Sequence, residues 1–287
     1  MISCREALGI ILGEVKTLPA RALPFSETLG LVLAEDITSG HDIPPFANSS
    51  MDGFSVRASD IKGASGDSPV RLRITGEMQA GDGRDLSLQP GTAIRIMTGA
   101  PVPGGSDTVV PKEETKTVGD TVHIRREFPE GRYVRPKGED VRQGSKVLKA
   151  GLVIGPATLG FLASLGVSEV KVVPRPAVSV VGTGNELVEA DEPLKPGQIR
   201  DSNSHSLVAQ IDAMGACGSR VGVARDTKED TLAKIRAALE ADVVITIGGV
   251  SVGEYDFVND VLAGLGAEQK FYKLRQEPGK PLAFWVL

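Results

Sequence analysis

The sequence is poor in cysteine and histidine. Only two cysteines occur among 287 residues, Cys4 and Cys217, and they lie far apart with no C-x-x-C pair. The three histidines, His41, His123 and His205, have no spacing typical of a metal site. These absences argue against a disulfide framework and against a zinc site, so both cysteines are expected to be inert.

Basic blocks and long apolar runs are also missing. Lys and Arg are spread along a chain of formal net charge −5, which gives no signal for nucleic acid or an anionic membrane. The longest apolar run, residues 243–252, holds about ten residues, against the roughly 20 that a membrane-spanning helix needs. The first residues do not resemble a secretory signal peptide. We therefore expect a cytoplasmic protein without a membrane segment.

The N-terminal residues predict helix. Ser3 followed by Glu6 is typical of a capping box, and the apolar segment behind it ends at Pro19, so we expect a first helix over residues 4–17. Another short helix is expected to start at Ser26.

The middle of the chain is typical of β structure. Residues 43–150 contain short β-type runs (VRLRI, TAIRIM, TVHIRR) separated by Gly, Pro and Asp turns, which predicts a compact β region. Residues 155–167 then predict a helix, and EVKVV predicts a strand.

After residue 176, strands and helices alternate. Strands are expected at AVSVVGTG, SRVGVARD, DVVITIGG and EQKFYKL, with helices at SNSHSLVAQIDAMG, TKEDTLAKIRAALE and DFVNDVLAGLG between them. This spacing predicts βαβ crossovers and a doubly wound, mainly parallel α/β sheet. The fold class is therefore α/β and β multidomain.

Glycines gather at the end of one predicted strand. The segment GGVSVGEYD, residues 248–256, leads into a helix, so its backbone N–H groups and the positive helix end could hold a phosphate or oxyanion. A tight turn in which Asp256 caps the helix is the alternative. Three glycines with a serine and two acids favour the ligand site over that turn. The residues concerned are Gly248, Gly249, Gly253 and Ser251.

Acidic residues stand at the ends of three predicted parallel strands: Glu186 in GTGNE, Asp226 in ARD, and Asp256. Taken alone, Asp226 is explained as a helix cap or first-turn acid, and so is Asp201. However, the carboxyl ends of parallel strands meet at one edge of a sheet, where ligands bind. Carboxylates that converge beside an anion site suggest Mg²⁺ bridging to phosphate oxygens.

Two lysines and two further acids complete the candidates. Lys273 and Lys280 flank the turn QEPGKPL and would attract an anionic ligand, although a surface lysine is ordinarily a solvated charge. Asp52 and Asp140 lie in Gly-containing turns, where an Asp ordinarily bonds its own backbone. Residue patterns alone do not connect these two acids to the sheet edge.

Seven separated motifs occur in order along nearly the whole chain: PPFANSSMDGFSVR (44–57), IMTGAPVPGGSDTVV (96–110), RPKGEDV (135–141), VVGTGNEL (180–187), GQIRDSNSHSL (197–207), TIGGVSVGEYDF (246–257) and PGKPLAFW (278–285). Together they closely resemble the molybdopterin molybdenumtransferase family, the bacterial relatives of the gephyrin E domain. The resemblance implies the last step of molybdenum cofactor synthesis. Adenylylated molybdopterin is cleaved with release of AMP, and molybdate is inserted into the dithiolene with the help of Mg²⁺.

The resemblance also assigns site residues. Positions that match the family's active-site acids are Asp52, Asp140, Glu186, Asp226 and Asp256, of which Asp256 is the expected metal contact. Positions expected to bind the substrate are Thr183, Gly184, Gly248, Gly249, Ser251, Gly253, Lys273 and Lys280.

The resemblance further implies an elongated homodimer. Its site would lie between the sheet domain of one subunit and the N-terminal region of the other, which would bring Asp52 and Asp140 to the cluster. A molybdopterin adenylyltransferase is a candidate partner. The implied domains are residues 1–45 plus 141–175, an inserted mostly-β domain at 46–140, and a molybdopterin-binding α/β domain at 176–287 that is incomplete. The family's C-terminal β domain is absent, so the chain is expected to be a fragment or a short form.

One position departs from the family pattern. Glu277 stands where relatives often carry a second lysine, four residues after Lys273, which removes a cation from a site meant for anions. Lys280 or Arg275 could compensate.

Two other functions remain as alternatives. A non-catalytic binding or scaffolding module would keep the pterin-nucleotide pocket without turnover. A nicotinamide-dependent oxidoreductase is suggested by GTGNE, but Leu187 replaces the third glycine of the dinucleotide fingerprint.

Overall fold

The computed structural model describes residues 1–248 and 257–287. They form two compact units, each described here by itself. Unit 1 comprises Met1–Ala34, Val153–Gly160 and Ser168–Leu287, and unit 2 comprises Glu35–Leu152 and Phe161–Val167. The division of the chain into three domains stays a prediction.

Unit 2 contains the expected β region. Its main sheet has six strands in the order β8-β5-β7-β6-β10-β9, and every neighbouring pair is antiparallel except β6 and β7. The strands are β5 (Gly53–Val56), β6 (Val70–Met78), β7 (Thr92–Ile96), β8 (Thr108–Pro111), β9 (Thr115–Val118) and β10 (Thr121–Ile124). Fully buried side chains such as Val56, Val110 and Ile124 fill one core cluster of this sheet.

Short ladders and turns complete unit 2. The strand β4 (Asn48–Ser49) pairs with β11 (Val134–Arg135), and β3 (Ile37–Thr38) pairs with β12 (Lys146–Leu148). Single 3-10 turns lie at Ala58–Ile61 and Lys112–Glu114.

Unit 1 is built around the predicted doubly wound parallel sheet. Its strands β14 (Ala177–Thr183), β17 (Cys217–Ala224) and β18 (Val243–Ile247) are parallel, with β14 in the centre. The helices α3 (Ser202–Ala213) and α4 (Lys228–Ala238) connect them.

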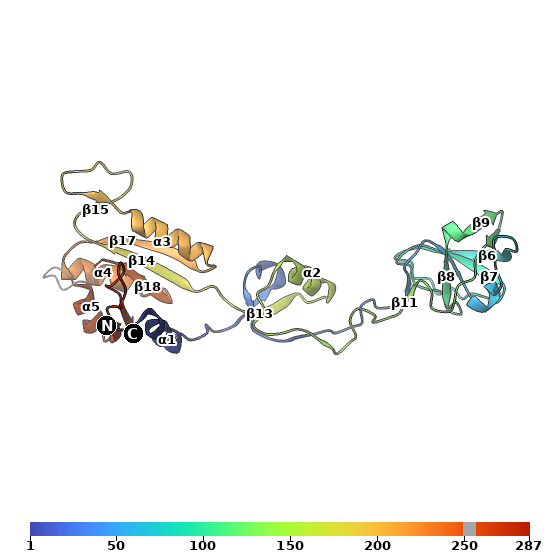
Figure 1. Cartoon of the computed structure of the whole chain (residues 1–287), viewed down its shortest axis with the longest axis horizontal. Coiled ribbons are helices and arrows are strands. Elements are labelled where there is room, and N and C mark those ends of the chain that lie inside the picture. The colour runs from blue at the N-terminus through green and yellow to red at the C-terminus, as the bar shows by residue number, and fades with distance from the viewer. Residues whose placement is uncertain (249–256) are drawn as a thin grey trace. The chain divides into compact units, whose positions relative to one another are not determined.

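Successive side chains of β14 point to opposite faces of the sheet. Val180 packs with Ile211 of α3, whereas the next residue, Val181, packs with Ala238 of α4. The two helices therefore cover opposite faces, as Figure 1 shows, and the predicted fold class is confirmed.

The first helix follows the capping prediction. α1 (Cys4–Glu14) begins after Ser3, whose hydroxyl accepts a hydrogen bond from the Glu6 nitrogen while the Glu6 carboxylate accepts one from the Ser3 nitrogen. It ends earlier than expected because Val15 is extended. At the second expected helix, only a 3-10 turn, Phe25–Glu27, is present.

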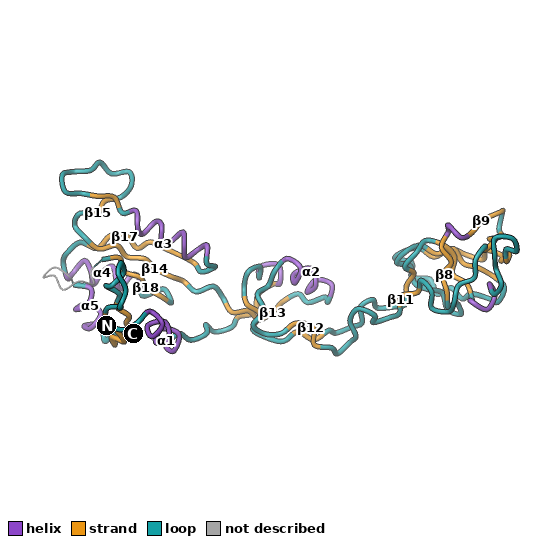
Figure 2. Tube along the Cα trace, viewed as in Figure 1, coloured by secondary structure: helices purple, strands orange, loops and turns teal. Residues whose placement is uncertain are grey.

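Further small sheets belong to unit 1. Antiparallel β1 (Arg21–Pro24), β13 (Glu169–Val173) and β2 (Val32–Leu33) form one of them, and α2 (Pro156–Ser164), which precedes β13, has residues in both units. The strands β15 (Leu187–Val188) and β16 (Ile199–Arg200) form a two-stranded parallel ladder, and the long loop drawn in teal above β15 in Figure 2 connects them.

The alternation does not continue beyond α5 (Val258–Gly264). The next strand, β19 (Glu268–Tyr272), pairs antiparallel with β20 (Ala283–Val286) instead of joining the parallel sheet. Phe271 and Leu274 of this hairpin pack with Ala7 of α1. The N-terminal helix thus supports the C-terminal hairpin. Among the described residues, no helix is long and apolar enough to cross a membrane.

Candidate functional site

The ends of two parallel strands touch at Thr183 and Gly248. The Thr183 hydroxyl donates to the carbonyl of Ile247, at 3.1 Å. Gly248 has a φ of 87°, and a Cβ at this position would lie 2.5 Å from Thr183 Oγ1. Gly248 is therefore required both for the backbone conformation and for the close approach of the end of β18 to the end of β14.

The ends of β14 and β17 are joined by a reciprocal pair of hydrogen bonds. The Asn185 nitrogen donates to Asp226 Oδ2 at 3.1 Å, and the Asp226 nitrogen donates to Asn185 Oδ1 at 3.2 Å. Asp226 does not cap α4. That position belongs to Thr227, whose side chain accepts from the Asp230 nitrogen, so the capping explanation of Asp226 is wrong. Asp226 fixes the loop that carries Glu186.

Glu186 lies beside Asn185 with an exposed side chain. Its carbonyl accepts from the Ile199 nitrogen at 2.8 Å. Its carboxylate folds over Gly184, where a side chain would collide with it. Gly184 has a φ of 139° and donates its backbone N–H to Ala224. Within residues 1–248 and 257–287, neither Glu186 nor Asp226 forms an ion pair, so both carboxylates are available to a cation.

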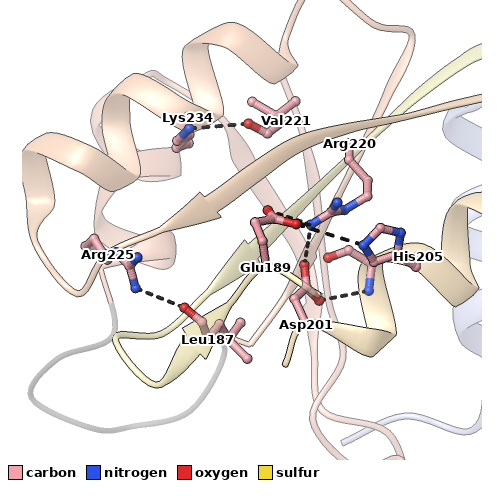
Figure 3. A network of polar contacts seen from close by, with 9 residues as sticks. Leu187, Glu189, Asp201, His205, Arg220, Val221, Arg225 and Lys234 are labelled. Carbon is pink, nitrogen blue, oxygen red and sulfur yellow. Dashed lines mark hydrogen bonds and ion pairs between the residues drawn. The ribbon is translucent and has the colours of Figure 1, made fainter. Parts of the chain in front are cut away.

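Asp201 has a structural role. Its carboxylate caps α3 by accepting from the Ser204 nitrogen at 3.1 Å, which confirms the capping explanation. Its Oδ2 also accepts from Arg220 Nη2 at 3.0 Å, and the same nitrogen contacts Glu189 (Figure 3). Burial opposes ionisation, but the bonds from Ser204 and Arg220 outweigh it and lower the pKa of Asp201.

The candidate cations lie on the β19–β20 hairpin. The side-chain Nζ of Lys273 lies over the ring of Tyr272, 4.7 Å from its centroid. The backbone nitrogen of Lys273 donates to the carbonyl of Leu282. The carbonyl of Lys280 accepts from Leu274, and the Lys280 side chain is exposed. Arg275 contacts Glu6 at 3.3 Å, so part of its charge is already paired.

Asp52 belongs to unit 2 and accepts two hydrogen bonds from Thr98. Lys112 Nζ is 3.9 Å from its other oxygen. Residue patterns do not group Thr98 and Lys112 with Asp52, because the three residues come together only when β5, β7 and β8 form neighbouring strands.

Asp140 is held by Arg135, which the sequence interpretation did not select. Arg135 Nη2 donates to Asp140 at 2.7 Å, and Arg135 Nε donates to Glu139 at 2.8 Å. In the β4–β11 ladder, Arg135 lies opposite Asn48, four residues before Asp52. The two acids of unit 2 therefore flank one short ladder. Their approach to the acids of unit 1 stays a prediction.

The other candidates of the glycine segment lie outside the described residues: Gly249, Ser251, Gly253 and Asp256. In the part that is described, no group of three or more His, Cys, Asp and Glu side chains could hold a metal ion. Mg²⁺ usually takes only one or two protein carboxylates and completes its shell with substrate phosphates and water. The oxygen donors of Glu186 and Asp226, at adjacent strand ends, fit that pattern.

A doubly wound sheet with glycines and acids at its carboxyl edge is typical of an α/β protein that binds a phosphorylated ligand there. Residues 2–166 match the family model "MoeA N-terminal region (domain I and II)", and residues 179–287 match "Probable molybdopterin binding domain".

Named relatives agree with these matches. Molybdopterin molybdenumtransferase 2 of Mycobacterium tuberculosis is 40% identical over 291 residues, covering 98% of this chain and 71% of its own length. Molybdopterin molybdenumtransferase of Staphylococcus aureus is 37% identical over 282 residues, covering 97% and 67%. The crystal structure of the molybdopterin biosynthesis MoeA protein from Pyrococcus horikosii has a TM-score of 0.86 at 36% identity, covering 100% of this chain and 72% of that one. The chain belongs to the molybdopterin molybdenumtransferase family, whose members are transferases of molybdenum cofactor biosynthesis.

Proposed function

We propose that this chain inserts molybdate into adenylylated molybdopterin and releases AMP. The observation that carries the proposal is the pairing of Asn185 with Asp226 at the carboxyl edge of the parallel sheet. It places the Asp226 carboxylate on Asn185, the residue before Glu186, whose own carboxylate lies over Gly184. Carboxylates that form no ion pair repel a polyanionic ligand, which raises the free energy of the complex unless a cation binds between them and the ligand. Their presence at a phosphate-binding edge supports a metal-assisted reaction.

The reaction has two parts. One water molecule cleaves the phosphoanhydride bond, which gives AMP and the phosphate monoester of molybdopterin. The two dithiolene sulfurs bind molybdenum, and their two protons leave with one molybdate oxygen as water. The backbone N–H groups of the glycine segment that follows β18 would orient the phosphates.

Mg²⁺ is part of the proposal. Glu186 and Asp226 would hold it together with Asp256, and the ion would neutralise charge on the phosphate oxygens during cleavage. Asp52, Asp140, Lys273 and Lys280 are proposed to contact the substrate or the molybdate. The Thr98 contact would keep Asp52 ionised, and the Thr98 and Arg135 contacts would hold the carboxylates of Asp52 and Asp140 in place.

The oligomeric state, the partner protein and the location are proposals as well. We propose a homodimer that completes the site, a molybdopterin adenylyltransferase as the partner that supplies the substrate, and the cytoplasm as the location. These proposals rest on the family resemblance.

The test is AMP release from adenylylated molybdopterin in the presence of molybdate and Mg²⁺. Glu186→Gln and Asp226→Asn keep the shape of each side chain, and the amide oxygen introduced at Asp226→Asn can still accept from Asn185. We expect each to reduce the rate of AMP release by about 10²-fold or more. Glu229→Gln, an exposed acid of the first turn of α4, is the matched control and should leave the rate unchanged.

A binding module without turnover predicts a different result. It would bind adenylylated molybdopterin and release no AMP in a single turnover, whereas the proposed enzyme does both. Wild-type rates in both acid variants would refute the assigned roles of Glu186 and Asp226.

A further inference from the structure

Glu186 lies at the centre of a three-residue segment whose backbone carbonyls are all hydrogen-bonded. The carbonyls of Asn185 and Leu187, on either side of it, accept from the guanidinium of Arg225. The carbonyl of Glu186 itself accepts from the Ile199 nitrogen. The segment therefore has little freedom to rotate.

Arg225 bridges the two flanking residues through a single nitrogen. Nη1 lies 3.0 Å from the Leu187 oxygen, the contact drawn in Figure 3, and 3.4 Å from the Asn185 oxygen. The first distance is that of a good hydrogen bond and the second is longer and weaker. Both carbonyls face the same cation, so the direction of the backbone at Glu186 depends on where Arg225 is.

Arg225 is in turn fixed by the start of α4. Its backbone nitrogen donates to Asp230 Oδ2 at 2.7 Å, and its carbonyl accepts from the Thr231 hydroxyl at 3.5 Å. Asp226, the next residue, makes the reciprocal pair with Asn185. The first turn of a helix thus anchors Arg225 and Asp226, and these two residues hold the segment around Glu186.

We propose that Arg225 is a positioning residue that directs the Glu186 carboxylate into the ligand site. The inference rests on the proposed function, because it gives Arg225 a role only through Glu186. Arg225 itself touches backbone carbonyls of residues 185 and 187 and no reacting atom. The guanidinium suits this task because its plane fixes the directions of the two N–H bonds of Nη1 and its charge is permanent, whereas a lysine ammonium is a flexible point charge.

The proposal also explains why the side chain of Glu186 needs no anchor of its own. Among the described residues it accepts no hydrogen bond, yet the backbone on both sides is held. A carboxylate on a fixed backbone stays available to a ligand cation or water, since no protein donor competes for its oxygens. Because Arg225 holds the backbone and not the carboxylate, the Glu186 carboxylate remains free to react.

The test is a double-mutant cycle between Arg225→Lys and Glu186→Gln, read by AMP release. Lysine keeps the charge but cannot hold both carbonyls in one geometry, so we expect kcat to fall roughly tenfold while KM changes less than about twofold. In the Glu186→Gln background, the same substitution should change kcat by less than about twofold, because the group it positions is already gone. Arg236→Lys, an exposed arginine of α4, is the matched control and should have no effect.

A second measurement reads the contact without catalysis. In Arg225→Lys, hydrogen exchange should become faster at the amides of Asn185, Leu187 and Ile199, and remain unchanged in the β14 strand. Equal loss of kcat in both backgrounds, or unchanged exchange at these amides, would overturn the proposal. Full activity of Glu186→Gln with faster exchange in Arg225→Lys would instead refute the role of Glu186 and leave the backbone contact in place.

Discussion

Thr98 donates two hydrogen bonds to the carboxylate of Asp52. Its Oδ1 accepts from both the nitrogen and the hydroxyl of Thr98, each at 2.8 Å. Asp52 immediately precedes β5 and Thr98 follows β7, so the contact closes one end of two neighbouring strands. The bonds from the Thr98 nitrogen and hydroxyl, helped by Lys112, hold the pKa of Asp52 below its ordinary value.

Thr98→Val should raise the pKa of Asp52 toward its ordinary value, because the backbone donor remains and the hydroxyl donor is lost. The carboxyl carbon of Asp52, followed by NMR during a pH titration, measures this change. Thr98→Ser keeps the hydroxyl and should titrate like the wild type. If Thr98→Val titrated like the wild type as well, the hydroxyl would have no part in setting this pKa.

Asp201→Asn should destabilise unit 1 by about 2 kcal/mol at neutral pH, because Arg220 loses a buried charged partner while the helix cap persists. Asp201 is 4% exposed. Its pKa is lower in the folded state, so its stabilising contribution is complete above the unfolded pKa and is lost as pH falls through the folded value.

Urea unfolding of the wild type and Asp201→Asn over a pH series checks this prediction. The difference in the free energy of unfolding should shrink below about pH 4, where the unfolded carboxyl starts to be protonated. Asp212→Asn, an exposed acid of the same helix, is the comparison, although its carboxylate accepts from the Gly218 nitrogen. A difference for Asp201→Asn that stays constant with pH would show that the ion pair does not stabilise the fold.

Much of unit 1 could be predicted from the sequence because its signals are local. The capping box at Ser3 and Glu6 and the alternation of strands and helices after residue 176 act over a few residues, and each is present in the structure. The strand β19 is present as predicted, but it pairs with β20 in a hairpin instead of joining the parallel sheet. An isolated β-type run carries no information about its partner, so the sequence could not distinguish a parallel neighbour from an antiparallel one.

The candidate site was predictable only in part. Glu186 and Asp226 could be grouped because both follow parallel strands, and such strand ends share one edge. Arg225 and Thr98 could not be found in this way. The side chain of Arg225 donates to backbone carbonyls of another segment, and Thr98 donates to Asp52, which is 46 residues away in the sequence. Contacts of this kind depend on the register between strands, which residue types do not reveal.

Gly248→Ala should destabilise unit 1 by roughly 1–2 kcal/mol or more, because φ is positive at this residue and a Cβ would collide with Thr183. Thermal unfolding measures the cost. Gly9→Ala is the control, since Gly9 lies inside α1 with nothing within 4 Å of a built Cβ, and alanine there should stabilise by up to about 1 kcal/mol. Equal stability of Gly248→Ala and the wild type would mean that the ends of β14 and β18 do not approach as closely as the structure shows.

Under the proposed function, Glu277→Lys should strengthen molybdate binding, because it replaces an exposed negative charge by a positive one four residues after Lys273. We expect the KM for molybdate to fall about fivefold at low salt, equivalent to roughly 1 kcal/mol for an exposed charge. The gain should decrease as ionic strength rises, since exposed charges are screened. Glu240→Lys makes the same change of charge at the exposed residue that follows the C-cap of α4, and it should leave this KM unchanged. A matching effect of both substitutions would indicate a general effect of net charge, whereas an effect of Glu277→Lys alone would place residue 277 beside the bound anion.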